Sequence, residues 1–247
     1  MSSRRKDNRR SNPKPRRPPV RAAAVPVSES TERTPNPDTN SPVEEDKSGF
    51  ERLIFFSDAV FAIAITLLII DIHLPDDADS NLGGALHHLY PEFEGFVISF
   101  LVIAIYWMTH HRLFGHIRGY NRRLMWNNMY VLMAVVFLPF STSLVSSYGE
   151  QALAVIFYAL NLALIGVCFL WLWLHAVYIG HHIDPKMPRA AIRANTVSLM
   201  IPPIVFLLTV PIAFVSPNVA KLSWLMIPVL FAVTGRLNDS AQQYLDH

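Results

Sequence analysis

The sequence predicts an all-α membrane protein with six transmembrane helices, and three observations lead to this fold class. Of its 247 residues, 51% are hydrophobic and only 16% are charged. The apolar residues gather into six segments, each close to the ~20 residues that a helix needs to cross ~30 Å of hydrocarbon. The loops between the segments alternate between basic and acidic or nearly neutral. We therefore expect one membrane domain behind a polar N-terminal segment.

That polar segment is residues 1–48, which hold 11 of the 21 Lys and Arg and 7 of the 19 Asp and Glu. It is rich in Pro and Ser and cannot bury enough apolar surface to order itself, so we expect a disordered cytoplasmic tail. It lacks the apolar core of a secretory signal. Its basic first half is expected to be attracted to anionic lipid head groups rather than to nucleic acid. The membrane domain then covers 49–236, and a short cytoplasmic tail covers 237–247.

The six apolar segments follow one another at short intervals, and none shows the alternating pattern of a β-barrel. The fourth has no charged residue between Gln151 and Ile183. The last two contain prolines, which membrane helices tolerate where neighbours satisfy the freed backbone carbonyls. The expected spans are 53–73, 94–111, 126–147, 152–179, 195–215 and 219–235.

The charges of the loops predict which side of the membrane each loop faces. Loop 75–91 contains three Asp and no Lys or Arg, whereas loop 112–124 contains four Arg. The turn near Gly149 has only Glu150, and loop 181–194 has one Lys and two Arg. Because basic loops stay on the cytoplasmic side, we expect a cell-membrane protein with both termini in the cytoplasm.

The first segment has two different faces when its residues are placed at 100° intervals around a helix. Asp58 falls on one side together with Phe61 and Ile65. A carboxylate at this depth is costly unless it has partners, so it marks a functional or architectural site. The opposite side carries an apolar stripe with one hydroxyl, formed by Ala59, Ile63, Thr66, Leu67 and Ile70.

The predicted topology supplies partners for Asp58 at the cytoplasmic ends of the next two spans. The second span ends there with Trp107, His110, His111 and Arg112, and the third begins there with Asn127 and Asn128. Each of these side chains can donate a hydrogen bond to a carboxylate. We favour a buried, multiply hydrogen-bonded Asp58 that fastens the three helices together, with a proton-relay or substrate role as the alternative.

The sequence carries no motif of an enzyme, and we expect no catalytic residue and no cofactor. The histidine pairs at 87–88, 110–111 and 181–182 lack neighbouring Cys or clustered carboxylates, so we expect no metal site. Cys168 is the single cysteine, and it excludes an intrachain disulfide.

The heptapeptide Arg52-Leu53-Ile54-Phe55-Phe56-Ser57-Asp58 fits an R-x-x-x-F-S-D signature at the start of the first span. With the apolar residues 59–68 behind it, the chain resembles the endosomal/lysosomal potassium-leak channel family in its prokaryotic form. Tyr106-Trp107 with His110-His111-Arg112, and Asn128 with Leu138-Pro139-Phe140, are also similar to the family pattern. The resemblance covers about residues 50–236.

The resemblance implies a cation channel without the P-loop filter of ordinary potassium channels. Prokaryotic members carry one six-helix repeat per chain and form homotetramers in which the first helices line the pore. The hydrophobic constriction of the family corresponds to Ile63, with Leu67 and Ile70 as further rings, and its polar ring corresponds to Thr66. The signature network corresponds to Arg52, Phe56, Ser57, Asp58, Trp107, His110, His111 and Asn128.

Animal members carry a serine just before the constriction residue, and this chain carries Ala62 there, so we expect weak selectivity. The expected function is passive conduction of K⁺, and of other monovalent cations, by a homotetramer in the lipid bilayer. Two alternatives remain: a proton-coupled secondary transporter that uses Asp58, and a non-conducting membrane scaffold.

Overall fold

The structure is a computed structural model, and it describes residues 42–70, 72–74, 82–119, 121–227 and 230. All of these belong to one compact unit, Asn40–His247. Most of the predicted tail, residues 1–41, lies outside the described residues, as do residues 231–247. The described part is helical, and a single isolated β-bridge joins two of its loops.

The first helix, α1 (Pro42–Leu67), begins seven residues before the predicted domain boundary at 49. Its start agrees with local chemistry, because Pro42 occupies the first helical position, for which proline is pre-organised. The helical segment therefore includes the acidic end of the predicted tail.

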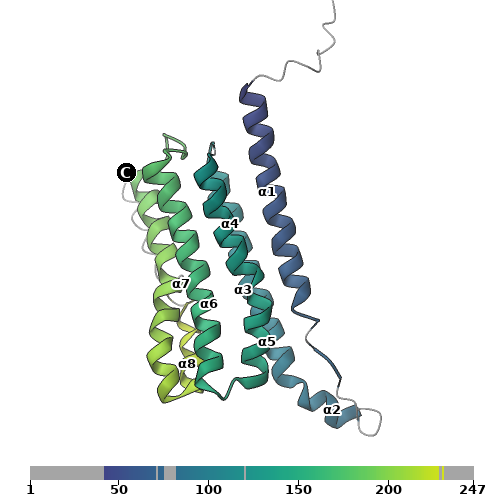
Figure 1. Cartoon of the computed structure of the whole chain (residues 1–247). Helices are drawn as coiled ribbons and strands as arrows, with labels where there is room; N and C mark the ends of the chain where they lie inside the picture. Colours follow the sequence, from purple (N-terminus) through teal and green to yellow (C-terminus); the bar gives the residue numbers. More distant parts are fainter. Residues whose placement is uncertain (1–41, 71, 75–81, 120, 228–229, 231–247) are drawn as a thin grey trace, which may run out of the picture. The chain divides into compact units, whose positions relative to one another are not determined.

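Four further helical segments are long and apolar enough to cross a membrane (Figure 1): Tyr90–His116, Arg122–Tyr148, Ala152–Ile179 and Arg189–Val215. Each contains one of the predicted spans, from the second to the fifth, so an apolar helix of sufficient length is confirmed at each of these four positions. α1 is not among them, because its helical part ends at Leu67 and contains the charged residues Glu51, Arg52 and Asp58 within its apolar half. The sixth predicted span, 219–235, lies partly outside the described residues.

The third predicted span consists of two helices, α4 (Arg122–Val136) and α5 (Leu138–Tyr148). The break at Phe137 has a local cause, because Pro139 has no N–H to bond the carbonyl four residues earlier. The remaining elements are α2 (Leu82–His88), α3 (Tyr90–His116), α6 (Ala152–Leu174) with the π-helical turn η2 (His175–Ile179), α7 (Arg189–Val215) and α8 (Pro217–Ser223).

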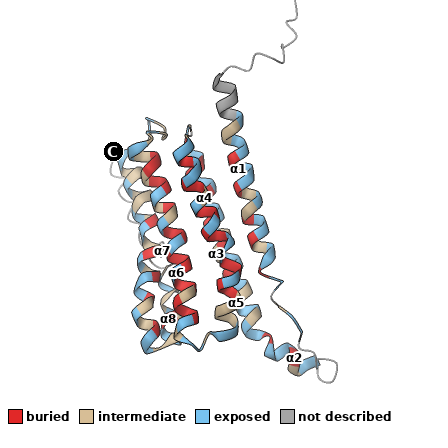
Figure 2. Ribbon diagram, in the orientation of Figure 1, coloured by how far each residue is buried: buried red, intermediate tan, exposed pale blue. Residues whose placement is uncertain are grey.

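The core gathers around α6, which packs against α4, α5, α7 and α8. Figure 2 shows buried residues along α6, and its Tyr158, Phe169 and Trp173 are almost completely shielded from solvent. α7 approaches α6 closely at Gly166, where a Cβ atom would lie 2.7 Å from Cδ of Pro203. α1 packs on this bundle through α3, α4 and α5. Only one side of α1 is covered, and this arrangement positions the candidate site.

Candidate functional site

One face of α1 is buried against the rest of the subunit. Its buried residues recur at intervals of four, four, three and four positions, which is the spacing of a single helical stripe. They are Leu53, Ser57, Phe61, Ala64 and Leu68. The sequence-based wheel placed Phe61 on the side opposite the Ile63 stripe, and the structure packs that side against α3, α4 and α5.

The predicted constriction residues lie on the uncovered face of α1. Ile63 is 57% exposed, Leu67 is 36% exposed, and Thr66 is also exposed. The Thr66 hydroxyl donates a hydrogen bond to the carbonyl oxygen of Ile63 at 2.9 Å. Its oxygen lone pairs therefore remain available to an approaching cation, because a hydroxyl has one donor and two acceptor sites.

Ile70 was predicted to continue the helical stripe, but the α-helix ends at Leu67. Leu68, Ile70 and Ile72 each donate their backbone N–H to the carbonyl three residues earlier, which is the tighter 3₁₀ pattern. β-Branched residues at 69, 70 and 72 have lower helix propensity than the leucines before them, which favours an early end. Ile70 is 57% exposed, but its direction no longer follows from the 100° rotation of an α-helix.

A buried polar network joins α1 to α3 and α4 through Ser57. The Nε2 atom of His110 lies 2.9 Å from Oδ1 of Asn128, and Nδ2 of Asn128 donates to the Ser57 hydroxyl at 2.8 Å. Ser57 in turn donates to the carbonyl of Leu53 at 2.8 Å. The amide nitrogen of Asn128 is the donor to Ser57, so its oxygen accepts and His110 Nε2 carries a proton. Each donor in this relay has one acceptor, and all three side chains are buried.

Aromatic rings enclose the imidazole of His110 and keep water from this network. The His110 ring stacks on Phe114 with centroids 4.2 Å apart. Phe61 from α1 lies 5.5 Å away, and Phe169 from α6 contacts the ring edge-on at 6.2 Å. His110 therefore belongs to the packed interior shared by α1, α3, α4 and α6.

Asp58 has a different environment from the one we predicted. It is half-buried, and Nε1 of Trp107 donates to its Oδ1 at 2.8 Å. His110 bonds to Asn128, and Asn128 bonds to Ser57 instead of Asp58, because consecutive helical residues point about 100° apart and Ser57 faces the core. Asp58 is therefore held by one indole at the edge of the interface rather than by several buried donors.

The other residues of the predicted network form none of these hydrogen bonds. The ring of His111 contacts Trp107 in a tilted arrangement, with centroids 5.9 Å apart. Arg52 and Phe56 are exposed on the isolated subunit. Within the residues that the structure describes, Arg52 forms no ion pair. In the same residues, no three His, Cys, Asp or Glu side chains are close enough together to hold a metal ion.

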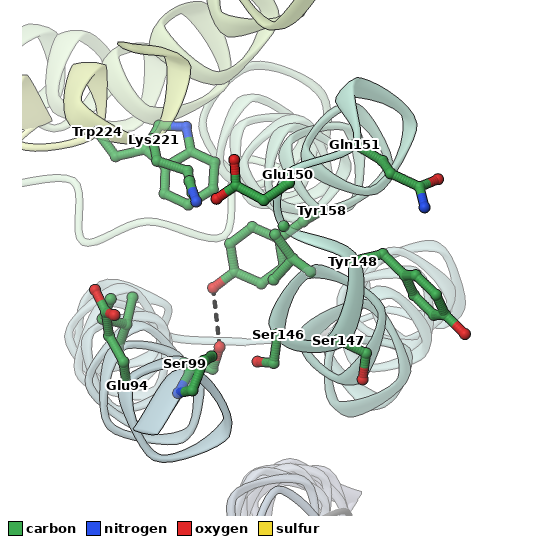
Figure 3. A pocket seen from close by; sticks show the side chains of 15 residues that line it. Glu94, Ser99, Ser146, Ser147, Tyr148, Glu150, Gln151, Tyr158, Lys221 and Trp224 are labelled. Atoms are coloured by element: carbon green, nitrogen blue, oxygen red, sulfur yellow. Dashed lines mark hydrogen bonds between the residues drawn. The ribbon is translucent and has the colours of Figure 1, made fainter. Parts of the chain in front are cut away.

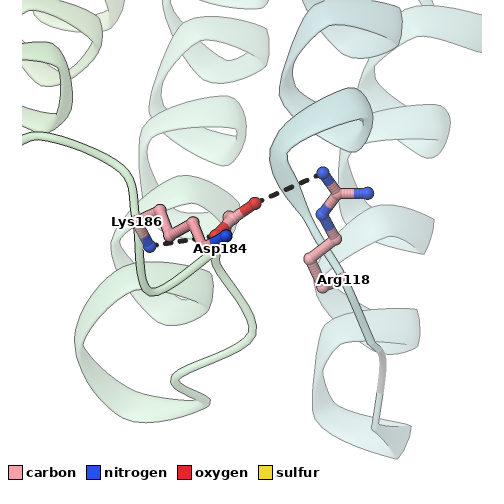
Figure 4. A network of polar contacts seen from close by, with 3 residues as sticks. All are labelled: Arg118, Asp184 and Lys186. Atoms are coloured by element: carbon pink, nitrogen blue, oxygen red, sulfur yellow. Dashed lines mark hydrogen bonds and ion pairs between the residues drawn. The ribbon is translucent and has the colours of Figure 1, made fainter.

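The loops after α3 and after η2 are joined in a way that the sequence did not predict (Figure 4). Arg118 forms an ion pair with Asp184 at 3.3 Å, and its backbone N–H donates to the carbonyl of His182 at 2.7 Å. The backbone N–H of Lys186, followed by the Arg118 guanidinium, lowers the pKa of Asp184. The loop charges predicted only which side of the membrane each loop faces. The structure brings the two loops into contact at one end of the bundle.

The chain matches known proteins over most of its length. The family model for "Endosomal/lysosomal potassium channel TMEM175" matches residues 52–139, which contain the second part of α1 and all of α2, α3 and α4. "Potassium channel B446_29190" of Streptomyces collinus is 38% identical over 170 residues, which cover 67% of this chain and 82% of that protein. "Potassium channel Cha6605_3372" of Chamaesiphon minutus is 31% identical over 196 residues, covering 77% of this chain and 93% of that protein.

The fold is similar to that of a solved channel structure. The crystal structure of "a lysosomal potassium-selective channel TMEM175 homolog" from Chamaesiphon minutus superimposes with a TM-score of 0.66 at 30% identity. The alignment covers 75% of this chain and 97% of the other. With two relatives above 30% identity matched over most of their length, this chain belongs to the TMEM175 family.

Proposed function

We propose that this chain forms a homotetrameric, potassium-permeable and weakly selective cation channel in the cell membrane. The observation that carries the proposal is the division of α1 into two faces. One face is fastened to the subunit by Ser57 and Phe61, while the other exposes Ile63, Thr66 and Leu67. A helix with an uncovered stripe of this composition is suited to line a pore shared by several subunits.

In this proposal, four copies of α1 surround one axis, with the Ile63 side chains forming the narrowest ring. Rings of large apolar side chains gate conduction by excluding water, so Ile63 is the constriction and Leu67 forms a second ring. Ile70 contributes a third ring just beyond the end of α1. Thr66, whose hydroxyl proton is already donated to Ile63, offers its oxygen to a dehydrating cation.

Selectivity and direction of transport follow from the same geometry. Ala62 offers no hydroxyl next to the constriction, so the pore discriminates weakly between K⁺ and other monovalent cations. Asp58 is tied by the Trp107 indole N–H on a different side of α1 from Ile63, so the proposal gives it no role in proton coupling and ions move down their gradient. Asp58 and the other signature residues, Arg52, Phe56, Ser57, Trp107, His110, His111 and Asn128, hold α1 in place, and those exposed on the isolated subunit contact a neighbouring subunit.

The proposed topology has six spans with both termini in the cytoplasm. The contact between the loops at Arg118 and Asp184 supports it, because both loops are assigned to the cytoplasmic side. The potassium-channel names of the Streptomyces and Chamaesiphon relatives support the identity of the permeant ion.

Flux through the purified protein in liposomes tests the proposal against its alternatives. With K⁺ inside and no pH gradient, we expect K⁺ efflux that reaches equilibrium without proton exchange. Flux that requires a pH gradient would instead identify a proton-coupled transporter. No flux from correctly assembled tetramers would identify a scaffold.

A further inference from the structure

The bundle contains a cavity of about 360 Å³ that the proposed pore does not use (Figure 3). It lies where α3, the end of α5, the start of α6 and α8 meet, beside the turn at Gly149. Its volume falls within the range of about 300–1,000 Å³ that is typical of small-molecule sites. This end of the bundle is opposite to the loop contact at Arg118 in the proposed topology.

Hydroxyl groups form one wall of the cavity. The hydroxyls of Ser99 and Tyr158 lie 3.0 Å apart, and Thr142 donates to Ser99 at 2.8 Å. Ser146 also contributes to the lining, but its hydroxyl packs against Gly95 of α3 and is shielded from solvent.

Charges of both signs line the same cavity without neutralising each other. Glu94, Glu150 and Lys221 all contribute to its lining, yet none of them forms an ion pair in the described part of the chain. Glu150 accepts a 3.4 Å hydrogen bond from the Asn218 amide, which leaves its negative charge uncompensated. In Figure 3 the ammonium of Lys221 and the carboxylate of Glu150 face the same space.

We propose that this cavity binds a phosphoethanolamine group, which carries a primary ammonium and a phosphate two carbons apart. The phosphate pairs with Lys221, and the ammonium donates to Glu94 and Glu150. Trp224, which lines the cavity beside Tyr158, covers the carbon chain between the two charges. Both ends of the ligand then form charge-assisted hydrogen bonds, the stronger kind in proteins.

The combination of charges excludes simpler ligands. A free anion would meet two carboxylates, and a simple cation would meet Lys221. A choline group has no N–H to donate to Glu94 or Glu150, so it would leave these acceptors unsatisfied. Only a zwitterion whose positive end carries N–H groups satisfies all sides of the cavity.

The position of the cavity suits a lipid head group as well as a soluble zwitterion. Tyr148 and Trp224 lie at this end of the bundle, and such aromatic residues gather where lipid head groups meet water. This placement rests on the proposed membrane topology, whereas binding of the zwitterion itself does not depend on ion conduction. A phosphatidylethanolamine of the outer leaflet and free phosphoethanolamine share the recognised chemistry.

Two binding experiments on the full-length purified protein test the proposal and separate the two sources. The first titrates O-phosphoethanolamine into the detergent-solubilised tetramer, with phosphocholine and inorganic phosphate as ligand controls. The second compares nanodiscs of phosphatidylethanolamine and phosphatidylcholine with identical acyl chains, and measures retained lipid by native mass spectrometry. The variants are Lys221→Met and Glu150→Gln, and the control is Lys186→Met, which removes an exposed lysine outside the cavity.

We expect O-phosphoethanolamine or phosphatidylethanolamine to be preferred over its choline counterpart in at least one experiment. Each cavity variant should weaken that binding about tenfold, as loss of one charge-assisted hydrogen bond implies, and Lys186→Met should not. Binding in the first experiment identifies a free zwitterion as sufficient, and preference in the second alone identifies the lipid. No preference in either experiment, equal binding of inorganic phosphate, or preference that survives both cavity variants would overturn the proposal. The proposed channel function is unaffected by these results, since K⁺ flux is measured separately.

Discussion

Ser57 and Asp58 are neighbours in the sequence, but they contribute to the α1 interface in different ways. Ser57 is buried and receives a hydrogen bond from Asn128, which is also paired with His110. Asp58 is half-buried and paired with Trp107, which is 39% exposed. A charged residue such as Asp58 is costly in a membrane helix and is therefore conspicuous in the sequence. The buried hydrogen bonds of Asn128 to Ser57 and His110 nevertheless make the larger contribution to holding α1. Removing a partner from a buried polar network leaves unsatisfied groups, which costs more than losing a contact near solvent.

The variant Asn128→Leu should therefore be more damaging than Trp107→Phe. Asn128→Leu leaves the buried Nε2 of His110 without a partner, at roughly 1–3 kcal/mol for an unsatisfied buried group. It also removes the donor to Ser57, which keeps only its hydrogen bond to the Leu53 carbonyl. Trp107→Phe removes one hydrogen bond to a partly solvated carboxylate, and we expect a loss of about 1 kcal/mol. The temperature at which the purified tetramer dissociates, followed by size-exclusion chromatography, ranks the two. A larger loss in Trp107→Phe would show that Asp58, not Ser57, is the main attachment of α1.

At the scale of elements, α6 and α7 depend on a close approach at Gly166. This glycine is buried, and a Cβ atom would lie 2.7 Å from Cδ of Pro203 and within 3.3 Å of two further atoms of that ring. Pro203 lies inside α7, where its ring takes the place of a backbone N–H. The glycine of one helix thus receives the proline ring of the other, and this contact sets the separation of the two helices.

The variant Gly166→Ala should destabilise the protein, although alanine favours helices. Overpacking a buried contact of this kind costs about 1–3 kcal/mol, more than the roughly 0.5–1 kcal/mol gained from helix propensity. Gly115→Ala on α3 is the matched control, because nothing lies within 4 Å of its Cβ position, and it should be neutral or stabilising. Thermal unfolding of both variants in detergent tests the pair. Equal behaviour of the two glycine variants would contradict the close contact.

Sequence patterns predicted the elements better than their ends and contacts. The apolar segments 94–111, 126–147, 152–179 and 195–215 each lie within one apolar helical segment of the structure. The break at Phe137 was missed because the apolar pattern runs through it without interruption. The end of α1 at Leu67 was missed for the same reason, since Ile69 and Ile70 continue the pattern while the hydrogen bonds change.

The candidate site was predicted in part because a helical wheel separates faces but does not choose partners. It placed Asp58 and Ile63 on different sides of α1, and the Trp107 contact with Asp58 was among the predicted pairs. It could not show that Asn128 would bond Ser57 rather than Asp58, since that depends on the rotation of α4 against α1. The cavity at Lys221 gave no sequence signal, because its charges come from three separate elements.

At the scale of the whole molecule, one side of α1 is left uncovered by the rest of the subunit. Ile63 and Thr66 are exposed on the side that α3, α4 and α5 do not cover. A fourfold arrangement would enclose this face and place Ile63 at a narrow apolar ring. We therefore propose the uncovered face of α1 as the conduction path.

The conductance of Ile63→Asn in planar bilayers tests this claim most directly. A polar side chain hydrates an apolar constriction, so we expect a several-fold increase in single-channel K⁺ conductance. Ile204→Asn on α7 is the control, because Ile204 is similarly exposed, at 47% against 57% for Ile63, and lies on a different helix. We expect a rise for Ile63→Asn and none for Ile204→Asn. An unchanged or lower conductance of well-assembled Ile63→Asn tetramers, or an equal rise in the control, would contradict it.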